Sequence, residues 1–195
     1  MLMFLTAVGL AVAAGFNAYL PMLAVILLSK YTDFFALPDS WSWLENNTTI
    51  LILAALTVVE FLADKIAAID SFNDVIQTLF RPASGGLLFT ASTTGSVAAT
   101  LDSFIHSPQF AQFIIGMSIA LVPHVLKMFT RAILNTTTGG MIAPLVSFGE
   151  NIVTVILIAA AVFAPVLVPV VVVLLALLGY KWAKTLINRK QAKAA

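Results

Sequence analysis

Two carboxylates lie one helical turn apart in an otherwise apolar stretch of this 195-residue chain. Glu60 and Asp64 are four residues apart, and Thr57 lies three residues before Glu60. In a helix this spacing puts both carboxylates on one face. An ionisable group inside a lipid bilayer costs roughly 2.5–3.5 kcal/mol on insertion scales, so such groups persist where they are paired, hydrated or functional. The pair is therefore a candidate site for proton or ion chemistry.

A basic stripe forms the second candidate. His124, Lys127 and Arg131 are spaced by three and four residues, and Asn135 continues the pattern. At 100° per residue all four share an arc of about 80° on one helix face. Pro123 comes directly before the stripe and is expected to kink the helix.

Glu150 is the most anomalous charge in the sequence. It lies about ten residues after Gly140, which corresponds to roughly 15 Å along a helix. If a helix begins at that glycine, Glu150 lies near the middle of a bilayer. Asn151 and Ser147 add polar groups beside it.

Charge and depth together suggest how these groups combine. We expect Glu60 and Glu150 to neutralise Lys127, with His124 close by. The cluster is then either a structural polar core, or a pathway for a cation, a proton or a small solute, or an interface with a partner or lipid. A carboxylate beside a histidine in a medium of low dielectric could exchange protons near neutral pH.

Two glycine pairs offer a separate anion site. Gly85-Gly86 and Gly139-Gly140 are each expected to begin a helix on the cytoplasmic side, with Arg81 or Arg131 upstream. Free amides at a helix N-terminus together with a guanidinium bind phosphate or a lipid headgroup. The alternative is that the glycines only permit a tight turn or close helix packing.

The segment 15–21, Gly-Phe-Asn-Ala-Tyr-Leu-Pro, places polar residues within an apolar stretch. Pro21 removes the helical hydrogen bond to the carbonyl of Asn17. The Asn17 side chain is expected to replace that bond or to line a cavity. A discontinuous helix and an ordinary tilted helix both fit this pattern.

Composition places these groups in a membrane. The chain is 61% hydrophobic and 10% charged, whereas a soluble domain carries about 25% charged residues. A net charge of +1 predicts no nucleic-acid partner. The sequence has no cysteine, which excludes thiolate metal sites and cysteine nucleophiles. We expect no metal, no cofactor and no catalytic residues, so the protein is not predicted to be an enzyme.

The predicted fold is all-α and polytopic, with about six transmembrane helices. A spanning helix needs roughly 20 apolar residues. The predicted spans cover residues 2–29, 49–66, 86–101, 110–129 and 141–182, the last divided in two at Pro165 and Pro169. Residues 70–80 are predicted to form a short amphipathic helix on the cytoplasmic face, ended by Pro82. The whole chain, 1–195, is then one transmembrane domain with a short basic tail over 183–195.

Basic residues predict the orientation. With six spans, one set of loops and tail holds nine Lys and Arg residues and the other set holds only Lys30. Because Lys and Arg favour cytoplasmic loops, both termini are predicted to be cytoplasmic. The nine are Lys65, Arg81, Lys127, Arg131, Lys181, Lys184, Arg189, Lys190 and Lys193.

An internal repeat is a further hypothesis. Ser84-Gly85-Gly86 and Thr138-Gly139-Gly140 are followed, after equal intervals, by Gly95 and Gly149. The chain is then built from repeated helical hairpins. Chance is the alternative, because Gly and Thr are common in membrane helices.

The motifs together resemble a family of small bacterial membrane proteins catalogued as domain of unknown function 4126. The resemblance covers nearly the whole chain and implies a multi-pass protein of the bacterial inner membrane, with no assigned activity. It is carried by residues 15–21, Glu60, 63–66, Asp70, Asp74, 81–83, His124, Lys127, Arg131, 138–140, Ser147 and Glu150.

The chain departs from this family pattern at three places. It has Ala67-Ala68 where Pro-Gly is expected, and Ala143 where Asn is expected before Pro144. It also has Asn151 where the pattern has a second acidic residue after Glu150, which weakens the case for a two-carboxylate ion site.

The leading functional hypothesis is a small-ion or small-solute transporter or channel, working as a homodimer in the lipid bilayer. The predicted lining is Asn17, Glu60, Asp64, His124, Lys127, Arg131, Glu150 and Asn151. The alternative is a membrane scaffold or lipid-binding protein that uses the anion site at Arg81, Gly85, Gly86, Gly139 and Gly140.

Overall fold

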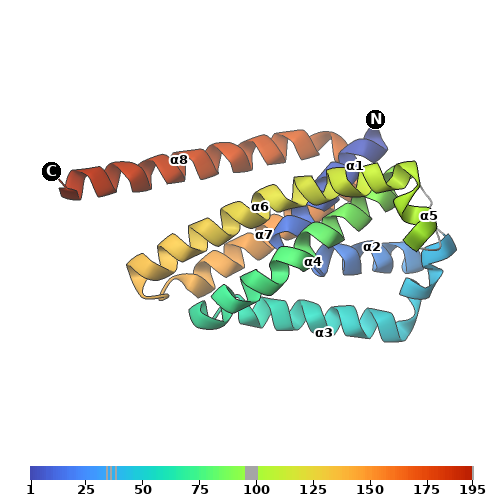
Figure 1. Ribbon diagram of the computed structural model, residues 1–195, viewed down its shortest axis with the longest axis horizontal. Coiled ribbons are helices and arrows are strands. Elements are labelled where there is room, and N and C mark those ends of the chain that lie inside the picture. The colour runs from blue at the N-terminus through green and yellow to red at the C-terminus, as the bar shows by residue number, and fades with distance from the viewer. Residues whose placement is uncertain (34, 36, 38, 95–100, 195) are drawn as a thin grey trace.

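The computed structural model describes residues 1–33, 35, 37, 39–94 and 101–194 (Figure 1). In this part the chain is all-α, as predicted. The α-helices are α1 (Leu2–Phe16), α2 (Leu20–Tyr31), α3 (Asn47–Ala63), α4 (Ala67–Thr94), α5 (Leu101–Ile105), α6 (Pro108–Thr138), α7 (Ala143–Phe163) and α8 (Val168–Ala194). Two 3-10 helices, η1 (Asp39–Glu45) and η2 (Pro165–Leu167), join α2 to α3 and α7 to α8.

The long helices run along the long axis of the molecule (Figure 1). At the centre, α4 packs most extensively against α6 and α1, and α1 also packs against α7. The chain begins at one end of the long axis and α8 finishes at the other (Figure 1).

The predicted first span over 2–29 is broken in two. The helix α1 stops at Phe16, and Asn17 has an extended backbone with φ −144° and ψ 124°. The Asn17 Oδ1 accepts hydrogen bonds from the amides of Tyr19 at 3.2 Å and Leu20 at 2.8 Å, which caps α2. Of the two predicted alternatives, the discontinuous helix is therefore correct. Because α1 begins and α2 ends at the same end of the molecule, the pair forms a hairpin with a buried bend (Figure 1).

Residues 70–80 are not a separate surface helix. They form one continuous helix with the following residues, and Pro82 lies inside α4 rather than ending it. On this helix Phe72 and Leu79 are exposed, whereas Asp70 and Asp74 are buried. The amphipathic pattern was read correctly, but its polar face points inward. This is the reverse of a helix on the surface of a soluble protein.

Glycines let α4 and α6 approach closely. A Cβ atom on Gly116 would lie 2.3 Å from the Cβ atom of Phe89 and 2.7 Å from the Gly85 carbonyl oxygen. On Gly86 it would lie 2.6 Å from the Phe113 ring. The pair Gly85-Gly86 therefore serves close helix packing in mid-helix, and the prediction that it begins a helix is wrong.

The second glycine pair does lie at a turn. Gly139 and Gly140 have φ of 62° and 79°, in the left-handed region that glycine favours. They end α6, and both amides donate to the Asn135 carbonyl. The two pairs thus differ in conformation, which contradicts the predicted repeat, and Gly95 lies outside the described residues.

Two of the described helices, α6 and α7, are each long and apolar enough to cross a membrane. Only 28% and 33% of their most apolar windows are buried inside the protein. The core helix of a soluble protein would bury most of such a window. The described surface is rich in Leu, Ile, Val and Phe while charged side chains are buried, and this distribution fits a lipid environment.

Candidate functional site: a buried charge cluster

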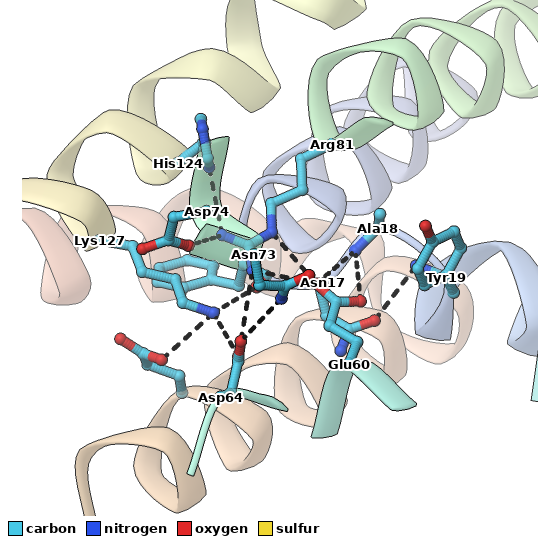
Figure 2. Close-up of polar contacts among 12 residues, drawn as sticks. Asn17, Ala18, Tyr19, Glu60, Asp64, Asn73, Asp74, Arg81, His124 and Lys127 are labelled. Carbon is cyan, nitrogen blue, oxygen red and sulfur yellow. Dashed lines mark hydrogen bonds and ion pairs between the residues drawn. The ribbon is translucent and has the colours of Figure 1, made fainter. Parts of the chain in front are cut away.

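Eight charged side chains from four helices meet inside the molecule, and we call them the charge cluster. Figure 2 shows the part of it around Glu60, Arg81 and Lys127. Seven of these residues are at most 4% exposed, and the side chain of the eighth, Glu150, is 13% exposed. The members are Glu60 on α3, Asp64 at its C-terminal end, Asp70, Asp74 and Arg81 on α4, Lys127 and Arg131 on α6, and Glu150 on α7.

Arg81 is the centre of one half of the cluster. Its Nη2 and Nε donate to Glu60 Oε1 at 3.0 and 3.2 Å, and its Nη1 donates to Asp74 Oδ1 at 3.1 Å. The side chain is completely buried. The prediction that Glu60 neutralises Lys127 is therefore wrong, and so is the assignment of Arg81 to an anion site, because carboxylates already occupy its guanidinium.

Lys127 links the two halves of the cluster. Its Nζ donates to Asp64 Oδ2 at 2.6 Å and lies 3.4 Å from Glu150 Oε2. Its pairing with Glu150 agrees with the sequence prediction. The second partner is Asp64 rather than Glu60, because Asp64 lies one turn further along α3 towards the start of α4.

Arg131 is the centre of the other half. Its Nε donates to both Glu150 oxygens, at 3.2 and 3.1 Å, and its Nη2 pairs with Glu150 Oε2. Its Nη1 donates to Asp70 Oδ1 and, at 2.7 Å, to the Asp64 carbonyl oxygen. Arg131 thereby joins α6 to the ends of α3, α4 and α7.

The break between α1 and α2 is held by this cluster (Figure 2). The Ala18 amide at the start of α2 donates to Glu60 Oε2 at 3.2 Å. The Phe16 carbonyl at the end of α1 accepts from Lys127 Nζ at 3.2 Å. A helix N-terminus carries partial positive charge and a C-terminus partial negative charge. Each interrupted end thus faces a side chain of opposite charge, and Asn17 lies at the bend between them.

His124 faces a guanidinium, not a carboxylate. Arg81 Nη1 lies 3.2 Å from His124 Nδ1, and Thr78 Oγ1 lies 3.0 Å from Nε2. Arginine only donates, so Nδ1 accepts. Thr78 uses its own proton towards the Asp74 carbonyl, so Nε2 donates to Thr78. His124 is therefore neutral with its proton on Nε2, and the predicted exchange of protons between a carboxylate and His124 does not fit this geometry.

The charges of the cluster do not balance. It contains five carboxylates, from Glu60, Asp64, Asp70, Asp74 and Glu150, but only three basic side chains, from Arg81, Lys127 and Arg131. Full ionisation leaves two surplus negative charges in a buried site. Removing one partner of a buried ion pair costs about 3–5 kcal/mol because the other charge stays uncompensated, so a surplus of this kind calls for bound cations or protons.

Two acidic residues of the cluster were not proposed as site residues from the sequence. Both were placed in the predicted surface helix over 70–80. The interval from Asp70 to Asp74 is four residues and that from Asp74 to Arg81 is seven, which puts all three on one helix face. Similar intervals in the basic stripe were interpreted as a common polar face. Asn151 is beside the cluster on α7, where its Nδ2 is buried and makes no hydrogen bond to the described residues.

An apolar cavity of about 320 Å³ lies between α1, α6 and α8. Its walls include Val12, Phe16, Pro123 and Val172, and all ten of its lining residues are apolar. Such a lining offers an ion no ligands, so this cavity is separate from the charge cluster although Phe16 and Pro123 border both regions.

Comparison with known proteins gives one family match. The model of the family described as domain of unknown function (DUF4126) matches residues 4–185. No curated protein and no solved structure matches the chain significantly.

Proposed function

The chain belongs to the family described as domain of unknown function 4126, and from this premise we propose that it is a multi-pass membrane protein that moves a small cation through the charge cluster. The apolar exterior and the buried charges support the membrane setting. The surplus of carboxylates supports a cation rather than an anion as the transported species.

The proposed topology has five crossing helices and one hairpin. The helices α3, α4, α6, α7 and α8 run between the two ends of the molecule, whereas α1 and α2 enter and leave at the same end (Figure 1). Arg81, Lys127 and Arg131 are buried in ion pairs, so they no longer count as loop residues. Lys65 and the basic tail still make their end the cytoplasmic one, which puts the N-terminus on the outer side.

The observation that carries this proposal is the helix break inside the charge cluster. Discontinuous helices whose half-helix ends point at an ion or substrate site are a recurring device of membrane transporters. Here the two interrupted ends contact Glu60 and Lys127. A change in the charge of either side chain would weaken its contact with the break and so couple ion binding to movement of the α1–α2 hairpin.

The test is ion flux in proteoliposomes under an imposed membrane potential, measured separately for potassium, sodium and protons. We expect flux of at least one cation in the native protein. Glu60→Gln keeps the side-chain shape and removes its charge, and it should reduce flux to the level of empty liposomes while the protein still inserts. Asp102→Asn, which changes a side chain that is 93% exposed, should leave flux unchanged.

A membrane scaffold is the second candidate function. The density of ion pairs in the charge cluster favours it, since such a network fixes how helices pack. In that case neither the native protein nor Glu60→Gln passes any cation, and the variant differs only by a lower melting temperature. Absence of flux in the native protein would therefore refute transport and leave the scaffold.

A further inference from the structure

Asp70 is the carboxylate of the charge cluster with the least support as an anion. It is 0% exposed, and its Oδ1 accepts from Arg131. Its Oδ2 is buried and makes no hydrogen bond to any described residue. An ionised carboxylate has two oxygens with about four acceptor positions, so half of this group is without a partner.

None of the other four carboxylates of the charge cluster has a buried oxygen without a hydrogen bond to the described residues. Glu60 accepts from Arg81 and from the Ala18 amide. Asp64 accepts from Lys127 and from Asn73 Nδ2 at 3.3 Å. The two oxygens of Glu150 share a bidentate contact with Arg131.

The charged side chains around Asp70 come from α3, α4, α6 and α7. Arg131 on α6 is its one cationic contact, and Glu150 on α7 shares that guanidinium. Asp64 at the end of α3 also lies 3.6 Å from Arg131 Nη2, and Asp74 is one turn away on α4. One guanidinium thus serves three carboxylates, with Asp74 adding further negative charge.

Other buried polar atoms without a hydrogen bond belong to residues close in sequence to Arg131 and Glu150. Within one helical turn of Arg131 or Glu150 lie Asn135 Nδ2, Ser147 Oγ and Asn151 Nδ2, all buried and without a hydrogen bond to the described residues. An amide N–H can donate to a carboxylate, and a hydroxyl can also accept from a protonated carboxyl. Side chains that can hydrogen-bond to an ionised or to a protonated carboxyl group are therefore found within one helical turn of Arg131 or Glu150.

We infer that the Asp70 carboxyl is a proton-binding site at the cytoplasmic end of the charge cluster, and that the proton is the cation that the pathway carries. This inference rests on the proposed function. Uptake forms an O–H bond on the free Asp70 oxygen and removes one surplus negative charge; release returns the proton and restores the charge. Among the described residues no three Asp, Glu or His side chains converge as they would to hold a metal ion.

Infrared difference spectroscopy tests the binding site without requiring transport. Near neutral pH, where exposed carboxyl groups are ionised, the native protein should still show the carbonyl band of a protonated carboxylic acid, and this band should disappear as the pH is raised further. The band should be absent in Asp70→Asn and should remain in Asp102→Asn. A band that persists in Asp70→Asn, or no such band at any pH at which the protein is folded, would overturn the assignment.

A conservative variant covers the case in which Asp70→Asn fails to fold. Asp70→Glu keeps a carboxyl group at this position but supplies it from a glutamate instead of an aspartate. With ¹³C-labelled aspartate the band of the native protein should shift, and the band of Asp70→Glu should not. A shift in both proteins would place the proton on another aspartate and refute the inference.

Flux measurements separate this inference from the proposed function. Proton uptake reported by a trapped pH-sensitive dye, with no flux of potassium or sodium, supports both. Flux of potassium or sodium without proton uptake leaves the transport proposal standing and contradicts the proton as the carried ion.

Discussion

Arg81 determines what its neighbours can do chemically. It donates to Glu60, Asp74 and His124 at once. Protonation of His124 at Nδ1 would place two donors against each other and break the contact with Arg81. The histidine thus serves as a neutral acceptor in the charge cluster, and the carboxylates are left as the groups that can exchange protons.

We predict opposite tautomers for the two histidines. His124 should carry its proton on Nε2. Exposed His106 places Nδ1 2.9 Å from the Asp102 carbonyl oxygen, which only accepts, so in this conformation its proton is on Nδ1. Nitrogen-15 NMR of protein labelled at histidine distinguishes the two forms. Finding the proton of His124 on Nδ1 would show that Arg81 does not donate to it.

The sequence predicted which residue types gather, but not all of their partners. Helical spacing correctly put Glu60 with Asp64 and Lys127 with Arg131 on common faces. It could not choose among equally spaced carboxylates on different helices, and so it paired Lys127 with Glu60. That choice depends on the axial offset between α3 and α6, which is fixed by tertiary packing.

At the scale of elements, the decisive feature is the close approach of α4 and α6. Their contact is made by Gly85, Gly86 and Gly116, and small residues at such an interface are what brings membrane helices together. The close contact also brings Arg81 within reach of His124. Sequence reasoning expected the first glycine pair to begin a helix and kept close helix packing as one alternative, which is the correct one. Glycine favours both turns and close packing, and local sequence does not separate the two.

Gly116→Ala should therefore destabilise the protein by about 1–3 kcal/mol, the usual cost of overpacking. The added methyl group would meet the Phe89 Cβ atom and the Gly85 carbonyl, neither of which can move without shifting a helix. Thermal unfolding in detergent measures the effect. Gly149→Ala is the matched control because a Cβ atom there meets nothing within 4 Å. Equal melting temperatures for the two variants would contradict the packing argument.

At the scale of the whole molecule, charge and apolar surface are reversed relative to a soluble protein. Composition and span length predicted this class and the all-α fold. They did not predict the hairpin of α1 and α2, because the apolar stretch over 2–29 is long enough for one span and only Asn17 and Pro21 interrupt it. The number of crossing helices and the side of the N-terminus that we propose both depend on that one break.

Single-cysteine labelling tests the proposed topology, and the native sequence contains no cysteine that would interfere. In right-side-out vesicles a membrane-impermeant maleimide should label Leu2→Cys and Asp102→Cys from outside. It should label Thr137→Cys and Lys184→Cys only after the vesicles are opened. If Leu2→Cys and Lys184→Cys were labelled from the same side, the original prediction of six spans would be restored.

The interrupted first segment also bears on how the protein is made. At 1.5 Å per residue, the 15 residues of α1 and the 12 residues of α2 extend about 22 and 18 Å, less than the roughly 30 Å of the hydrocarbon core. Neither helix alone is therefore long enough to cross the bilayer as the chain is synthesised. The residues at their bend can contact Glu60 and Lys127 only after both have been synthesised. The N-terminal segment of the nascent chain therefore reaches its final position only once α6 has emerged.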